Sequence, residues 1–223
     1  LSRRGTGGRR MRRTAAGVCA LLAICAAAAA GGPPQFPLPA PQKDGGRPLM
    51  RALSLRKSTR SFAAKGIPPQ TLSNLLWAAC GVNRPDSGRR TAPSAKDWRE
   101  IDLYAATADG LYRYDAPAHR LDPVLAGDIR AAAGGQAFVK TAPVVLVYVA
   151  DHGKAAGVPP EARDFYCSAD AGFISQNVYL FCASEGLATV VLGWIDKPRL
   201  ERIMGLRPGQ KVILSQPVGY PKE

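Results

Sequence analysis

Apolar residues recur at helical spacing in the first half of the chain. After Pro68-Pro69 they fall three and four residues apart, at Leu72, Leu75, Leu76 and Ala79. This period predicts an amphipathic helix that ends at Gly81, with Thr71 as a candidate N-cap.

A longer helix is predicted over residues 162–185, where Gly186 follows as a natural stop. Its sequence is apolar most of the way round, so we expect it to be buried, either centrally or in a subunit interface. A further short helix is predicted over 197–204, before Gly205.

Strand patterns alternate with these helices. Asp109-Gly110 predicts a hairpin turn between two of the strands. The remaining pieces are a short helical segment at 127–133 and strands at 101–105, 111–114, 143–150, 187–193 and 211–220. Because helices and strands are mixed without a regular βαβ repeat, the order favours an α+β sandwich with a largely antiparallel sheet flanked by helices.

The N-terminal part reads as a targeting segment followed by a linker. Residues 1–30 join a basic stretch to an Ala-rich apolar run, as in a signal peptide, although a retained membrane anchor is an alternative. Residues 31–50 are rich in Pro and Gly and predict an extended linker or meandering arm. The folded domain is then 51–223. We expect an exported protein, periplasmic or otherwise extracytoplasmic, that contacts a membrane only if the first segment is uncleaved.

Charge and composition narrow the class of ligand. Hydrophobic residues make up 46% of the 223 residues, enough for one core, and the net charge is +13. Six arginines among the first 13 residues supply part of that excess. The positive charge that remains on the rest of the chain suits an anionic cofactor. The sequence contains no nucleic-acid-binding signature and no zinc-ligand spacing.

The cysteines and histidines predict no metal site and no disulfide framework. Cys19 and Cys25 lie in the N-terminal apolar run, and the other three are widely spaced. We expect these three to be small buried hydrophobic residues: Cys80, Cys167 and Cys182.

The stretch Arg56-Lys57-Ser58-Thr59-Arg60-Ser61-Phe62 is the strongest candidate for chemistry. It holds three cations and three hydroxyls. Arginine forks and hydroxyl donors suit a phosphate monoester. Taken alone, however, the stretch is better explained as a solvated basic turn.

Six short motifs in order carry a resemblance to a known family. They are Arg56-Lys57-Ser58-Thr59-Arg60, the helix end at 75–84, the loop 90–95 with Pro93-Ser94-Ala95, Asp170-Ala171-Gly172 with Gln176-Asn177, Gly186-Leu187 leading to Leu192-Gly193, and Pro217-Val218-Gly219-Tyr220-Pro221. Through them, residues 51–223 resemble the nitroreductase family of FMN flavoproteins. The pattern is most similar to the compact subgroup that includes azoline dehydrogenases of the SagB type.

The resemblance implies which residues of one chain contact FMN. Arg56, Lys57 and Ser58 would hold its phosphate. Arg60 would reach the pyrimidine edge, where a cation stabilises the negative charge that develops on reduction. Leu192-Gly193 would bring a backbone N–H close to flavin N5, and a side chain on Gly193 would crowd the ring, although an ordinary turn glycine is the alternative.

The resemblance also implies a homodimer with FMN at its interface. Pro93, Ser94 and Ala95 would touch the flavin from the second subunit, although Ser94 could instead be a turn residue or an N-cap. Gln136 would face the ribityl chain or the ring edge.

Two features depart from the family pattern. Asp97 stands where many members have Asn, and this acid could weaken a flavin or substrate contact. Many larger relatives carry a basic C-terminal arm, whereas this sequence stops at Lys222-Glu223. We therefore expect phosphate binding to rely on Arg56 and Lys57, with help from a loop arginine such as Arg89 or Arg90.

These inferences predict an FMN-dependent oxidoreductase that passes two electrons from NAD(P)H, or another donor, to an electron-poor small molecule such as a nitroaromatic or a quinone. An exported flavin-binding protein without NAD(P)H turnover is one alternative. An oxygen-coupled dehydrogenase of the azoline-forming type is another.

Overall fold

The computed structural model of the protein describes Leu1, Phe36 and residues 38–222. Apart from Leu1, the predicted signal peptide or anchor at 1–30 lies outside the described residues. Within the described part of the chain, no helix has both the length and the apolar character that a bilayer crossing needs.

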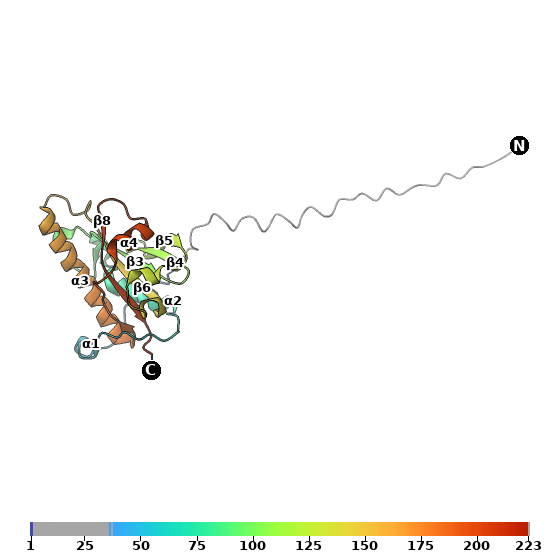
Figure 1. The fold of residues 1–223 in the computed structure, drawn as a ribbon. Coiled ribbons are helices and arrows are strands. Elements are labelled where there is room, and N and C mark those ends of the chain that lie inside the picture. Colours follow the sequence, from blue (N-terminus) through green and yellow to red (C-terminus); the bar gives the residue numbers. More distant parts are fainter. Residues whose placement is uncertain (2–35, 37, 223) are drawn as a thin grey trace. The chain divides into compact units, whose positions relative to one another are not determined.

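A six-stranded sheet forms the centre of the domain (Figure 1). Every neighbouring pair of its strands is antiparallel. In spatial order the strands are β5 (Arg120–Ala126), β4 (Gly110–Asp115), β3 (Ile101–Ala106), β6 (Val144–Asp151), β8 (Gln210–Gly219) and β7 (Ala188–Thr189). This arrangement confirms the predicted α+β fold with an antiparallel sheet.

Helices cover both faces of the sheet. They are α1 (Leu49–Leu55), α2 (Pro69–Cys80), α3 (Pro160–Glu185) and α4 (Lys197–Met204). On β6, Leu146 and Tyr148 join a core that includes residues of α2 and α3, whereas Val145 and Val147 join a core that includes residues of α4. The continuous apolar run predicted at 143–150 is therefore a strand buried on both faces.

Helix α2 shows the predicted apolar face but begins earlier than its predicted cap. It starts at Pro69, and Pro68 occupies the N-cap position without a side-chain hydrogen bond. Thr71 is therefore not the N-cap, and that prediction was wrong. Proline suits the first turn because its missing N–H would have no helical partner there.

Helix α3 ends as predicted, at Gly186 in the left-handed conformation (φ +70°). Only one side of it is buried within the protomer. The opposite side exposes Phe165, Tyr166 and Phe173, at 68%, 37% and 48% of their surface. The helix is therefore not buried all round within the described residues, and its burial in a subunit interface stays a prediction.

Several elements differ from the sequence predictions. The strand predicted at 187–193 pairs only at Ala188–Thr189, and Leu192 then forms an isolated bridge with Ser215. The helical piece predicted at 127–133 is a 3₁₀ turn, Arg130–Ala133. Strand β5 was not predicted, because Pro123 and Asp122 interrupt its apolar pattern, and an edge strand tolerates both.

Part of the segment predicted as a linker runs along the domain. The amide side chain of Gln70 donates to the Ala40 carbonyl at 2.9 Å, and the Arg47 N–H donates to Ser184 Oγ at 2.7 Å. Helix α1 follows directly and packs against α3.

The three cysteines of the domain are free and buried, as predicted: Cys80, Cys167 and Cys182. Burial raises the pKa of Cys80 to about 11 and that of Cys167 to about 12. The thiols therefore stay protonated at neutral pH and act as small core residues.

Candidate functional site

The cationic stretch that begins at Arg56 is fixed to the end of α3 by one tyrosine. Ser58 Oγ lies 2.9 Å from the Tyr179 hydroxyl, which also accepts the Val191 backbone N–H at 2.9 Å. The tyrosine is then free to donate its own proton to Ser58. The Thr59 N–H donates to the Thr189 carbonyl at 2.9 Å. These bonds hold the stretch beside the segment that leads to Leu192-Gly193.

The charges of this stretch are not neutralised by any ion pair within the described residues. The Arg56 guanidinium lies over the Tyr179 ring, 5.3 Å from its centroid, and leaves its N–H groups available. Arg56, Lys57 and Arg60 form no ion pair with any carboxylate in the described residues. Lys57 and Arg60 are exposed. The stretch therefore presents an uncompensated positive surface.

The segment at Leu192-Gly193 has a fixed backbone and an open face. Leu192 exchanges two backbone hydrogen bonds with Ser215, of 2.8 and 3.0 Å. Gly193 is exposed, and a Cβ added to it would meet only Leu214 Cδ2, at 3.9 Å. Nothing inside the protomer therefore requires a glycine at this position.

Gln136 belongs to a loop that packs on the same segment. A Cβ added to Gly134 would come within 2.9 Å of Leu192 Cδ1 and within 3.4 Å of Gln136 Oε1. Ser215 Oγ donates to the Ala133 carbonyl and fixes the start of this loop. The structure thus brings the segments of Arg56–Arg60, Leu192-Gly193 and Gln136 into one neighbourhood.

Pro93, Ser94 and Ala95 lie at the other half of α3. The Ala95 N–H donates to Asp170 Oδ2 at 2.8 Å. Asp170 precedes Tyr179 by nine residues, which corresponds to about 14 Å along a helix. Within one protomer, residues 93–95 are therefore separated from the cationic stretch.

The loop that follows Ser94 adopts an unusual backbone. Lys96, Asp97 and Arg99 all have positive φ, at 50°, 57° and 52°. Non-glycine residues in this region are strained, and such strain clusters at functional sites. Asp97 and Arg99 pair at 2.6 Å, which holds the pKa of the Asp97 carboxyl below its usual value. The acid at position 97 is thus neutralised by its neighbour.

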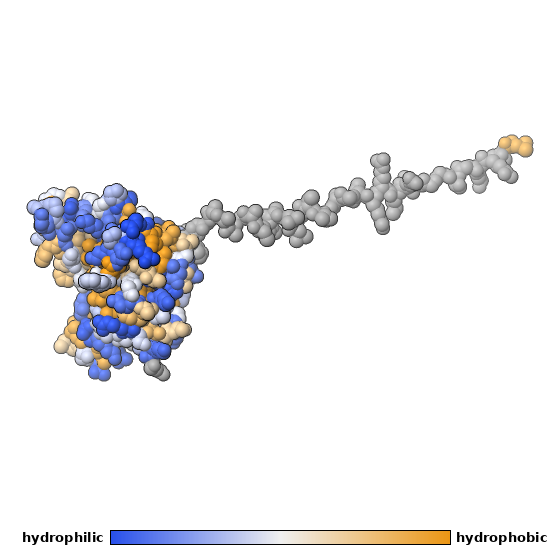
Figure 2. Space-filling model, viewed as in Figure 1, coloured by the Kyte–Doolittle hydropathy of each residue, from blue (hydrophilic) through white to orange (hydrophobic). Residues whose placement is uncertain are grey.

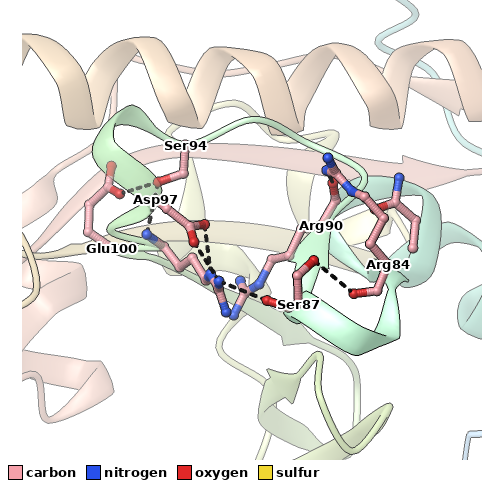
Figure 3. Close-up of polar contacts among 8 residues, drawn as sticks. Arg84, Ser87, Arg90, Ser94, Asp97 and Glu100 are labelled. Carbon is pink, nitrogen blue, oxygen red and sulfur yellow. Dashed lines mark hydrogen bonds and ion pairs between the residues drawn. The ribbon is translucent and has the colours of Figure 1, made fainter.

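Beneath this loop, Glu100 is fully buried and was not singled out from the sequence. Ser94 Oγ donates to Glu100 Oε2 at 3.1 Å and accepts the Arg99 N–H at 2.8 Å (Figure 3). Among the described residues, Glu100 Oε1 has no hydrogen-bond partner. Burial, and to a lesser degree the neighbouring Asp170 carboxylate, raises the pKa of Glu100 to about 7. The acid therefore keeps its proton into the neutral range.

A cavity of about 290 Å³ opens between this loop and the β1–β2 ladder, β1 (Val82–Arg84) and β2 (Arg89–Arg90). Its lining combines arginines with buried carboxyls: Arg84, Arg89, Arg90, Arg99, Glu100 and Asp170. Pro93 and Ser94 also line it, so the predicted flavin-contacting loop forms one of its walls.

Comparison with known proteins identifies the family. The sequence profile described as the Nitroreductase family matches residues 53–220. The chain belongs to the nitroreductase family. In general terms, the protein is therefore a flavin-dependent oxidoreductase. The closer resemblance to the SagB-type azoline dehydrogenases stays a prediction.

Individual relatives agree with this assignment. A crystal structure of a nitroreductase-family protein from Ralstonia eutropha JMP134 matches with a TM-score of 0.82 at 46% identity, over 85% of this chain and 90% of that one. A protein of Methanocaldococcus jannaschii described as a nitroreductase is 29% identical over 174 residues, 74% of this chain and 86% of the relative. The NADPH-flavin oxidoreductase of Vibrio harveyi is 26% identical over 99 residues, 41% of each chain.

The residues present fit a phosphorylated flavin. A phosphate needs cations and hydroxyl donors. Arg56, Lys57 and Ser58 offer both, and within the described residues neither cation forms an ion pair. A flat ring needs an uncrowded backbone, which the open face of Gly193 provides.

Proposed function

We propose that the chain is an FMN-dependent oxidoreductase that works as a homodimer. It would pass two electrons from NAD(P)H, or another donor, to an electron-poor organic acceptor such as a nitroaromatic or a quinone. The observation that carries the proposal is the joint role of Tyr179, which bonds Ser58 on one side and Val191 on the other. Tyr179 thereby holds the cationic stretch at Arg56–Arg60 next to the exposed backbone of Gly193.

The proposal assigns these residues to different parts of the cofactor. Arg56, Lys57 and Ser58 bind the phosphate through charge-assisted and neutral hydrogen bonds. Arg60 supplies a cation at the pyrimidine edge of the ring, where it offsets negative charge. Gly193 leaves room for the ring and offers its backbone N–H. Gln136 lies in the loop that packs on Leu192 and adds a polar group.

The bound flavin supplies the two-electron chemistry through its N5 position. No side chain needs to act as a nucleophile. The protein binds and orients the cofactor, sets its electrostatic surroundings and shapes the space for the donor and acceptor. The NADPH-flavin oxidoreductase of Vibrio harveyi among the relatives supports NAD(P)H as the electron donor.

The position of the 93–95 loop supports a homodimer. This loop is fixed at Asp170 and the cationic stretch at Tyr179, on opposite halves of α3. If two copies of α3 pair antiparallel about a two-fold axis near their midpoint, the 93–95 loop of one protomer approaches the cationic stretch of the other. Such a pairing gives each flavin site residues from both chains.

The outer surface of α3 suits this pairing. Phe165 and Phe173 are exposed there, and α1, which packs against α3, exposes Leu49 and Met50. In Figure 2, apolar residues reach the surface of the domain among hydrophilic ones. Burial of these side chains against a second copy would remove apolar area from water and stabilise the dimer.

Stopped-flow reduction of the FMN-loaded protein by NADPH, with menadione or nitrofurazone as acceptor in turnover, tests the proposal. The Arg60→Ala variant is expected to slow flavin reduction at least tenfold, whereas the Arg202→Ala variant, at an exposed position on α4, should match the wild type. An Arg60→Ala protein that is reduced as fast as wild type would show that the role of Arg60 is wrong.

Two other results would redirect the proposal. A yellow protein that oxidises no NAD(P)H with any acceptor would be a flavin-binding protein without this turnover. Release of hydrogen peroxide from an organic donor without NAD(P)H would indicate an oxygen-coupled dehydrogenase.

A further inference from the structure

Four arginines and three acids line the cavity beside the 93–95 loop. Within the described residues, only one of these arginines, Arg99, has a carboxylate partner, Asp97. Arg84 donates to Asn83 Oδ1 at 3.1 Å and to the Arg90 carbonyl at 2.9 Å, both uncharged. Arg89 and Arg90 form no ion pair within the described residues, and Arg90 Nε is buried without a hydrogen-bond partner.

The interior of the cavity adds a second unpartnered polar group. Glu100 is buried and contributes to the lining, and its Oε1 has no hydrogen-bond partner in the part of the chain that the structure describes. A protonated carboxyl offers one O–H donor and carries no charge to oppose an anion. Buried donors and acceptors without partners are costly, so their presence in a cavity points to a polar ligand.

The rest of the lining limits the size of the ligand. Its apolar part includes Ala92, Pro93, Ile101 and Ile174. Its other acids already have partners, because Asp97 pairs with Arg99 and Asp170 accepts the Ala95 N–H. At about 290 Å³ the cavity lies at the lower end of the range for small-molecule pockets. A single ring with one anionic group suits these walls and the arginine side better than a whole dinucleotide or a whole flavin.

We propose that this cavity binds the carboxylate of a small aromatic or heteroaromatic acid and thereby selects anionic electron acceptors. Arg89 and Arg90 bind the carboxylate, and the apolar walls contact the ring. The inference rests on the proposed function, because Pro93 and Ser94 belong both to this cavity and to the predicted flavin-contacting loop. A ligand in the cavity is therefore held against the loop that would meet the cofactor.

A matched pair of acceptors tests the proposal: 4-nitrobenzoate, which is anionic, and 4-nitrobenzamide, which is neutral and similar in size. In the test reaction NADPH supplies a hydride and solvent supplies a proton. The nitro group takes up these two electrons and two protons, loses one oxygen as water and becomes nitroso. Wild-type kcat/KM for each acceptor gives a preference ratio that does not depend on FMN content.

Arg89→Gln and Arg90→Gln are expected to lower the ratio of 4-nitrobenzoate to 4-nitrobenzamide about tenfold or more, since a charge-assisted hydrogen bond is lost. Arg89 is exposed, and its side chain makes no hydrogen bond within the described residues, so its loss should leave the fold intact. Arg202→Gln, which removes an exposed arginine of α4, is the matched control and should keep the wild-type ratio.

Unchanged ratios in both cavity variants would overturn the proposal. So would weaker FMN binding with an unchanged ratio, because the arginines would then serve the cofactor phosphate. Calorimetric titration of the FMN-loaded protein with 4-nitrobenzoate, without NADPH, measures binding to the cavity independently of turnover. Binding that weakens in the cavity variants supports the cavity even if no acceptor is reduced, whereas absence of binding to wild type contradicts it.

Discussion

Ser58 and Tyr179 are 121 positions apart in the chain, and their hydroxyl oxygens lie 2.9 Å from each other. The same tyrosine hydroxyl accepts the Val191 N–H. One side chain of α3 therefore fixes the cationic stretch and the approach to Gly193 at once. This connection brings together two short segments, far apart in sequence, to which the proposed function assigns one cofactor.

Removing that hydroxyl should loosen both segments. Tyr179→Phe leaves Ser58 and the Val191 N–H without this partner, and we expect a loss of about 1–2 kcal/mol in stability together with weaker FMN binding. Thermal unfolding and FMN titration measure the two effects. Tyr220→Phe is the control, since the Tyr220 hydroxyl has no hydrogen-bond partner within the described residues. Unaltered FMN affinity in Tyr179→Phe would show that the tyrosine does not position the site.

The open face of Gly193 gives a prediction that separates folding from binding. A methyl group there meets only Leu214 Cδ2 at 3.9 Å, so Gly193→Ala should keep the wild-type thermal midpoint of the cofactor-free protein. Bound FMN would be crowded by the same methyl, and overpacking of this kind should raise the FMN Kd about tenfold or more.

Gly66→Ala is the matched control, because an added Cβ there meets nothing within 4 Å. If Gly193→Ala binds FMN as tightly as wild type, Gly193 is an ordinary turn glycine.

The buried Glu100 predicts a specific pH dependence of stability. Its pKa is raised from 4.5 to about 7 in the native state, so between these pH values the native protein holds a proton that the unfolded chain has released. The contribution of Glu100 to the free energy of unfolding is therefore greatest below pH 4.5. It falls as the pH rises to about 7, by at most about 1.4 kcal/mol per pH unit.

Several charged and polar groups surround Glu100. Asp170 and Cys167 face it from α3, Ser94 donates to it, and Arg90, Asp97 and Arg99 line the same cavity. The neutral variant Glu100→Gln lacks the proton equilibrium. Its thermal midpoint relative to wild type should therefore rise between pH 5 and pH 7.

Glu161→Gln, at an exposed position in the first turn of α3, is the control and should keep a constant difference from wild type. A constant difference for Glu100→Gln as well would mean that Glu100 titrates normally.

The exposed face of α3 predicts the oligomeric state. Phe173→Asp puts a charge at the centre of the proposed interface, where it would be buried without a partner, so we expect monomers in light scattering and parallel loss of FMN binding. The folded domain should keep its circular dichroism, because Phe173 is 48% exposed in the protomer. Val124→Asp, at a residue of β5 that is 40% exposed, is the control and should remain dimeric. A dimeric Phe173→Asp protein with bound FMN would contradict this interface.

The elements that could be predicted from the sequence are those whose pattern reflects burial. The apolar run of β6 and the period of α2 follow directly from which faces they bury. Strand β5 and helix α1 could not be predicted in this way. β5 is an edge strand with a proline, and α1 is a short helix with one buried residue that follows a Pro- and Gly-rich segment.

The charged residues of the candidate site could be predicted from the sequence, but the residues that position them could not. Arg56, Ser58 and Arg60 stand out because cations and hydroxyls gather in one stretch. Tyr179 does not, because a tyrosine in an apolar helix looks like a core residue. Glu100 likewise precedes a strand and gives no sequence signal of its burial. Their roles depend on contacts between segments that only the folded chain brings together.

Titration of the purified protein with FMN, with the mass of the complex measured by light scattering, tests the central claim most directly. The account predicts a yellow dimer that binds one FMN per protomer and loses it on dissociation. Colourless monomers that bind no added FMN would contradict it.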